Sequence, residues 1–186
     1  MNFEFPRKSV HLLTLLVPLF SFYSLSLTQG ILIFFILFYL FSEYQKIKGH
    51  AFFAHRFILH LERNEEKKHF AKAPLFLAVG VLGAISLFSW KASLIGISQA
   101  GFSDTMAAWC GKKWGKTALP FVHRKTYIGI IAFFLSALPL SLMILPYSQA
   151  VLMALVGAFL EALPFKDWDN LTIPLLCSGL AAILLS

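Results

Sequence analysis

About seven apolar stretches occupy most of this chain, and they constrain its fold more than any other feature of the sequence. They cover residues 9–27, 30–45, 73–90, 92–109, 127–146, 148–163 and 170–186. Most are long enough to cross the hydrocarbon core of a bilayer as a helix. Because 58% of the residues are hydrophobic and only 13% are charged, the composition is that of a polytopic membrane protein. We expect an all-α integral membrane protein with about seven transmembrane helices in a single domain, residues 1–186.

The basic residues predict the orientation of these helices. If the N-terminus is cytoplasmic, every lysine and arginine except Lys91 falls on the cytoplasmic side, as the positive-inside rule requires. The C-terminus is then outside. The acidic residues lie in or near the same side, so we expect a cytoplasmic active face. The loop around residues 49–71 is rich in aromatic and basic residues and is expected to form an interfacial helix.

The net charge of +7 does not indicate a nucleic-acid-binding protein. The basic residues lie in short loops between apolar stretches, not on an independent basic face. The short chain and compact loops favour the inner (cytoplasmic) membrane of a bacterium. The sequence does not predict an oligomeric state.

One acidic residue, Asp104, lies inside an apolar stretch on a row of small residues. Gly101, Asp104, Ala108, Gly111 and Gly115 follow one another at spacings of three and four, so in a helix they share one face. A charge at the centre of an apolar span costs about 2.5–3.5 kcal/mol on insertion scales, which makes it a candidate functional residue.

Two interpretations of this segment are open. In the first, Asp104 binds a divalent cation or accepts a proton, and the lysines that follow bind phosphate. In the second, the small residues are a packing face, and Asp104 pairs with one of those lysines. The lysines are Lys112, Lys113 and Lys116. Packing explains the glycines better than it explains the carboxylate.

Two further polar groups flank the later apolar stretches. The basic segment His123-Arg124-Lys125-Thr126 opens the fifth stretch and suits either a polyphosphate or ordinary charged flanking. Glu161 lies near the end of the sixth stretch, and three oxygen-bearing residues follow it: Asp167, Asp169 and Asn170. Carboxylates of this kind suit magnesium, although one of the three is expected to cap the seventh helix.

Four segments, in order along the chain, resemble the CTP-dependent lipid-alcohol kinases, the family of dolichol kinase, phytol kinase and the CTP-using diacylglycerol kinase. They are Arg7-Lys8-x-x-His11, the segment Gly101–Gly115 with Asp104 and Ala107, Lys125-Thr126-Tyr-Ile-Gly129, and Glu161 followed by Asp169-Asn170-x-x-x-Pro174. The resemblance extends distantly to CDP-diacylglycerol synthases. Ser103 and Ile128 replace a glycine and a glutamate of the family pattern.

The resemblance implies a set of site residues, a donor and a metal. Catalytic roles fall on Asp104, Lys116 and Lys125. Nucleotide binding falls on Arg7, Lys8, His11, Gly111, Gly115, Lys112, Lys113, Arg124, Thr126 and Asn170. Magnesium, or another divalent cation, would be held by Asp104, Glu161, Asp167 and Asp169. CTP is the expected phosphoryl donor.

The expected function is phosphoryl transfer from CTP, or another nucleoside triphosphate, to a lipid alcohol taken from the bilayer. A polyprenol, a phytol-like alcohol and diacylglycerol all offer a hydroxyl on a long apolar tail. Two alternatives stay open: cytidylyl transfer to phosphatidate, and a non-catalytic membrane protein that binds or transports lipid or nucleotide.

Overall fold

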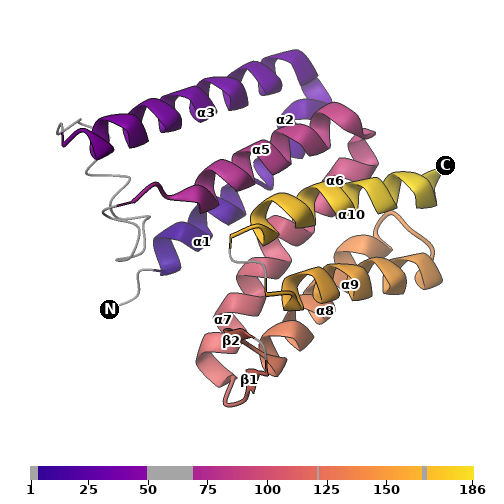
Figure 1. The fold of residues 1–186 in the computed structure, drawn as a ribbon. Helices are drawn as coiled ribbons and strands as arrows, with labels where there is room; N and C mark the ends of the chain where they lie inside the picture. The colour runs from indigo at the N-terminus through magenta and orange to yellow at the C-terminus, as the bar shows by residue number, and fades with distance from the viewer. Residues whose placement is uncertain (1–3, 50–68, 121, 165–166) are drawn as a thin grey trace.

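The computed structural model describes residues 4–49, 69–120, 122–164 and 167–186, which form a mostly helical bundle with one short β-hairpin (Figure 1). The helices are α1 (Glu4–Leu13), α2 (Leu16–Tyr23), α3 (Leu25–Ile47), α5 (Lys72–Leu87), α6 (Trp90–Ser98), the π-helical turn η1 (Gln99–Ser103), α7 (Asp104–Trp114), α8 (Tyr127–Leu142), α9 (Tyr147–Ala162) and α10 (Asp169–Leu185). Strands β1 (Ala118–Leu119) and β2 (Val122–Thr126) pair antiparallel.

Each apolar stretch of the sequence corresponds to a helix or to a short series of helices. The all-α expectation is confirmed apart from the hairpin. Two stretches are not single α-helices. The first is interrupted between α1 and α2 and again at Ser24, before α3, and the fourth runs through α6, the π-turn and α7. The helix expected around 49–71 lies almost entirely outside the described residues.

One helix in the described part of the chain, α3, is both long and apolar enough to cross a membrane. Only 11% of its apolar window is buried, so it presents apolar side chains outward, unlike the core helix of a water-soluble protein. Helices α5, α8, α9 and α10 are apolar but shorter, at 16 or 17 residues. The seven crossings and their orientation therefore stay predictions.

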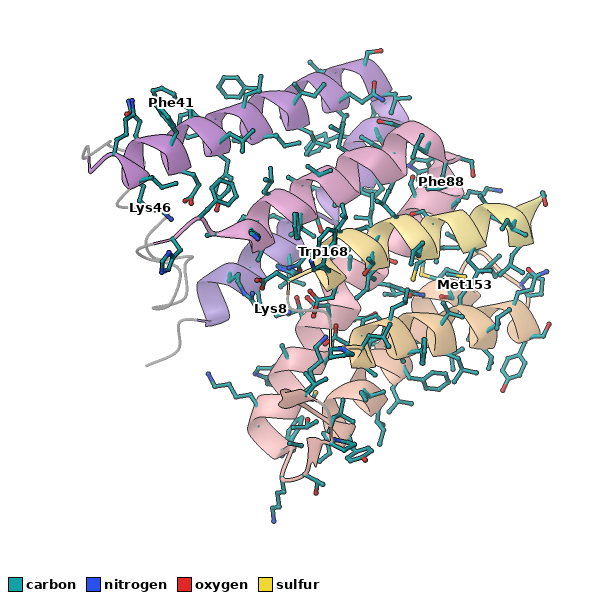
Figure 2. All side chains as sticks on the ribbon, viewed as in Figure 1. Lys8, Phe41, Lys46, Phe88, Met153 and Trp168 are labelled. Atoms are coloured by element: carbon teal, nitrogen blue, oxygen red, sulfur yellow. The ribbon has the colours of Figure 1, made fainter. Side chains whose placement is uncertain are left out.

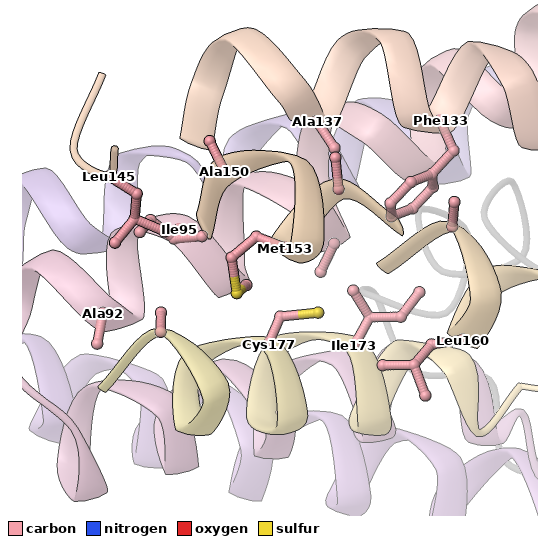
Figure 3. Packing of buried hydrophobic residues seen from close by; sticks show 14 of the residues in the cluster. Ala92, Ile95, Phe133, Ala137, Leu145, Ala150, Met153, Leu160, Ile173 and Cys177 are labelled. Carbon is pink, nitrogen blue, oxygen red and sulfur yellow. The ribbon is translucent and has the colours of Figure 1, made fainter. Parts of the chain in front are cut away.

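The core lies between α6, α8, α9 and α10. Phe133 of α8, Met153 of α9, and Ile173 and Cys177 of α10 converge there and are almost fully buried (Figure 3). Alanines fill most of the remaining core positions. Small residues let helices approach closely where the surrounding medium is itself apolar, and α10 packs against α5, α6 and α9 in this way.

The contact between α6 and α10 depends on Gly96. A Cβ atom at this position would lie 2.2 Å from Ser178 Oγ and 2.6 Å from the Pro174 carbonyl oxygen. Because one of these atoms belongs to the backbone, a larger residue would force the two helices apart. Gly30, on α3, provides a contrast, since nothing lies within 4 Å of a Cβ placed there.

We expect Gly96→Ala to lower the free energy of unfolding by about 1–3 kcal/mol through overpacking. Gly30→Ala should raise it by about 0.5–1 kcal/mol, because alanine loses less backbone entropy in a helix. Titration of the detergent-solubilised protein with SDS, followed by circular dichroism, measures both. Equal effects of the two substitutions would contradict the packing of α6 against α10.

Candidate active site

Three polar side chains from the beginning and the middle of the sequence meet in a buried cluster, the Asp104 cluster, which consists of Lys8, His11 and Asp104. Lys8 Nζ lies 2.5 Å from Asp104 Oδ2, and His11 Nδ1 lies 2.9 Å from the same oxygen. Lys8 Nζ also donates to the Asp104 carbonyl oxygen at 3.3 Å. Figure 2 labels Lys8 on α1. All three residues are buried, so the carboxylate is compensated by two donors instead of by solvent.

Close helix packing brings the two halves of this cluster together. Asp104 is the first residue of α7, and Lys8 and His11 share one face of α1 because they are three residues apart. At Gly101, a Cβ atom would lie 2.8 Å from the His11 carbonyl oxygen and 2.9 Å from Thr14 Oγ1. The glycine therefore allows α1 to approach the turn that precedes Asp104.

A second cluster, the Lys125 cluster, consists of the buried Glu161 and the half-buried Lys125 and Asp169. Lys125 Nζ lies 3.0 Å from Asp169 Oδ2 and 3.3 Å from Glu161 Oε2, and it also donates to the Glu161 carbonyl oxygen. Strand β2 supplies the lysine, the last turn of α9 supplies Glu161, and α10 begins at Asp169. One cation thus joins the ends of three elements.

The charge state of Lys125 follows from these neighbours. Burial by itself lowers the pKa of the Lys125 ammonium, but the carboxylates of Glu161 and Asp169 outweigh burial and raise that pKa. The charge of Asp104 acts in the same direction. The two clusters are therefore close enough to influence each other electrostatically, and Lys125 carries its positive charge at neutral pH.

The hairpin and α7 fix the place of Lys125. Thr126, the next residue, caps α8, because its hydroxyl accepts the Gly129 N–H at 3.1 Å. Gly111 and Gly115 face the same hydroxyl: a Cβ atom would lie 2.8 Å from Thr126 Oγ1 at Gly111 and 2.4 Å from it at Gly115. These two glycines, expected to bind nucleotide, lie against protein in this structure, so the packing interpretation accounts for them.

Three lysines follow Asp104 at the end of α7 and just beyond it. Lys112, Lys113 and Lys116 are exposed, and Lys113 Nζ lies 5.1 Å from the ring centre of Trp109 and 4.9 Å from that of Trp114. Asp104 is therefore paired with Lys8, not with one of these three. The backbone of Arg124 is part of β2, but its side chain is outside the described part of the structure.

Two of the remaining predicted residues, Asp167 and Asn170, lie around the start of α10, and the third, Arg7, lies on α1. The Asn170 side chain donates to the Asp167 carbonyl oxygen at 3.2 Å, and Asp167 adopts a left-handed backbone conformation with φ of 63°. Asn170 therefore stabilises the turn before α10. Arg7 neighbours Lys8 on α1 and is partly buried.

Carboxylate oxygens are ligands that magnesium prefers, but the carboxylates in the described part of this structure do not converge on one point. Among the residues that the structure describes, no three His, Cys, Asp or Glu side chains converge as a metal site. Glu161 Oε2 is buried and accepts no hydrogen bond, although Lys125 is within ion-pair distance. An under-coordinated carboxylate oxygen is the kind of ligand that magnesium prefers.

Sequence reasoning found the members of both clusters but not their pairing. It assigned Lys8 and His11 to the nucleotide, whereas both contact Asp104, and it did not anticipate that Lys125 joins Glu161 to Asp169. It also missed Gln99, a fully buried residue five positions before Asp104. A lone amide inside an apolar stretch was the available signal.

Fold and site together define a mostly helical protein with two lysine–carboxylate clusters, one buried and one partly buried. The chain is 30% identical over 143 residues to a protein of Oryza sativa subsp. japonica named probable phytol kinase 1, chloroplastic, a match over 66% of this chain and 45% of that protein. It is 30% identical over 133 residues to a probable phytol kinase of Triticum aestivum, with 61% and 44% covered. Phytol kinase 1 of Arabidopsis thaliana is 26% identical over 133 residues, with 61% and 43% covered.

These matches confirm the resemblance read from the sequence: the chain is a homologue of plant phytol kinases, one of the groups named in that resemblance. The matched segment spans less than half the length of each of these relatives. No protein-family model matches the chain, and no solved structure matches it.

We expect Lys125→Met to lower the free energy of unfolding by about 3 kcal/mol, because it leaves the buried Glu161 and the half-buried Asp169 without their cation. Adding Glu161→Gln should restore part of this loss by removing one of the uncompensated charges. Lys113→Met, the exposed control, should cost less than about 1 kcal/mol. SDS titration of the four proteins measures the differences, and equal losses at Lys125 and Lys113 would refute the stabilising role of the Lys125 cluster.

Proposed function

We propose that this protein is a membrane kinase that transfers a phosphoryl group from a nucleoside triphosphate to a lipid alcohol of the phytol type. The observation that carries the proposal is the coincidence of two facts. The chain is homologous to proteins named phytol kinase, and the motif residues Lys8 and His11 are in direct contact with Asp104, which is far from them in sequence.

We propose that the helices cross a membrane about seven times, with the N-terminus and both clusters on the cytoplasmic side and the C-terminus outside. The outward apolar face of α3 supports this arrangement, as does the distribution of lysine and arginine. The bacterial inner membrane stays a prediction, because the relatives named above are chloroplastic proteins of plants.

The proposed chemistry uses charges that the structure already holds in place. Lys8 and Lys125 would move from their carboxylates to the phosphate oxygens of the nucleotide, because an ammonium pairs with either anion. The lipid hydroxyl oxygen bonds to the γ-phosphorus while the bond from that phosphorus to the β–γ bridging oxygen breaks. The nucleoside diphosphate leaves with that oxygen, and the hydroxyl proton passes to water. Positioning and charge neutralisation supply most of the catalysis in such transfers.

Asp104, Glu161 and Asp169 are the residues that would hold a magnesium ion, which when bound would neutralise charge on the transferring phosphate. Asp104 suits this role better than that of a base, because Lys8 and His11 both stabilise its charged form. Exposed Lys112, Lys113 and Lys116 would attract the anionic nucleotide to this side of the protein. CTP is the proposed donor, on the resemblance alone.

We expect Asp104→Asn to reduce lipid phosphorylation by about a hundredfold or more, because the amide cannot hold Lys8 and a cation as the carboxylate does. The measurement is transfer of label from the γ-phosphate to phytol by the purified protein. Glu43→Gln is the matched control, since Glu43 is also a buried carboxylate paired with a lysine, Lys46, but lies on α3 outside both clusters. Near-normal turnover of Asp104→Asn would overturn the assignment.

The position of the label separates the kinase from cytidylyl transfer. With CTP labelled at the γ-phosphate, a kinase yields labelled lipid phosphate. With CTP labelled at the α-phosphate and phosphatidate as acceptor, label in the lipid would indicate a cytidylyltransferase. A panel with ATP, CTP, phytol, a polyprenol and diacylglycerol then defines donor and acceptor, and failure to bind any nucleotide with magnesium would favour a non-catalytic protein.

A further inference from the structure

The helix that carries Asp104 contains a π-helical turn immediately before it. In the turn η1, Gln99–Ser103, the Asp104 N–H donates to the Gln99 carbonyl oxygen, five residues earlier, instead of to the carbonyl four residues earlier. Such turns amount to one inserted residue in an α-helix and occur frequently at functional sites. The insertion sets the direction in which every later side chain of α7 points.

The Gln99 side chain anchors this turn to the other half of the bundle. It is fully buried, and its Nε2 donates to Ser141 Oγ on α8 and to the Met153 carbonyl oxygen on α9, each at 3.4 Å. Gly157 makes room for it: a Cβ atom at Gly157 would lie 2.1 Å from Gln99 Oε1. Helices α8 and α9 therefore pack directly against the Gln99 amide.

The opposite side of the turn faces α1. The Ala100 carbonyl oxygen lies 3.3 Å from His11 Nδ1, and Gly101 lies against the backbone of His11. The turn is therefore held from two directions, by Gln99 toward α8 and α9 and by Ala100 and Gly101 toward α1. Asp104 follows directly and reaches Lys8 and His11.

We infer that Gln99 is a positioning residue: its amide keeps the π-turn in place and so directs the Asp104 carboxylate toward Lys8 and His11. Without the anchor, the turn can relax to an ordinary α-helix. A change of one residue in register rotates the following side chains by about 100° and shifts them by about 1.5 Å. That rotation would carry Asp104 away from α1.

The hydrogen bonding of Gln99 argues against a purely stabilising role. Its two donor contacts are long, and its Oε1 is buried without a hydrogen-bond partner. An orphaned buried acceptor costs free energy that an apolar side chain of similar shape would avoid. An apolar replacement should therefore leave stability unchanged or raise it, while it disturbs the position of Asp104.

The test compares Gln99→Met, which keeps the length of the side chain and removes the amide, with the native protein. For its effect on turnover the inference rests on the proposed kinase activity. We expect kcat to fall about a hundredfold, with little change in the KM for nucleotide and no loss of stability in SDS titration. Ser178→Ala, which removes another fully buried polar group outside the turn, is the matched control and should leave kcat unchanged.

A second readout does not depend on activity. His11 Nδ1 faces two acceptors, Asp104 Oδ2 and the Ala100 carbonyl oxygen, so Nδ1 carries the proton. Nitrogen-15 NMR of histidine-labelled protein, with His11→Gln to assign the signal, reports this tautomer. We expect Gln99→Met to lose the preference for the Nδ1–H form, and Gly157→Ala, which displaces the Gln99 amide, to lose it as well.

An unchanged His11 signal in both variants would overturn the inference, whatever the activity. A changed signal in a protein whose native form phosphorylates no lipid alcohol would support the positioning role and refute the proposed function instead. A third outcome would also overturn the inference: Gln99→Met and Ser178→Ala lose equal stability, and kcat falls in both. Loss of core packing alone would then explain the fall in kcat.

Discussion

The buried carboxylate of Asp104 is the constraint on which the site depends. An uncompensated charge at this depth would cost several kcal/mol, and the chain compensates it with two donors from α1. That requirement brings the beginning of the sequence against its middle. It also explains the glycine at position 101, since α1 could not otherwise come close enough for its side chains to reach the carboxylate.

Both clusters pair lysine with carboxylate, which has a consequence for anion binding. When a polyphosphate reaches Lys8 or Lys125, the lysine exchanges a carboxylate partner for a phosphate partner. The ammonium therefore pays no new desolvation cost. The carboxylates released by this exchange could then take a divalent cation in place of the lysine. If the protein binds a nucleotide as proposed, each lysine would keep an anionic partner through binding and release.

The sequence predicted the helical class, the approximate bounds of most helices and every residue of both clusters. Hydropathy and a family pattern were enough for that, because apolar stretches and motif order are local properties. The pairing of the clusters was beyond reach, since Lys8 and Asp104 are 96 positions apart and no local rule relates them. The π-turn was likewise hidden, because the spacing of Gly101, Asp104, Ala108 and Gly111 is equally compatible with an unbroken α-helix.

Gly111 and Gly115 illustrate how one pattern can have two explanations. Their spacing matches the family motif, but in the structure both are small because Thr126 lies against them. Their part in nucleotide binding stays a prediction.

The hairpin itself divides into a part that tolerates change in length and a part that does not. Thr126 must cap α8 and contact Gly111 and Gly115 at once, and Lys125 must reach α9 and α10 from the preceding position. An added residue between Lys125 and Gly129 would break one of these relations. At the turn between Leu119 and Val122, an added residue disturbs neither, so natural variants of this protein should differ in length at the tip of the hairpin and keep its base constant.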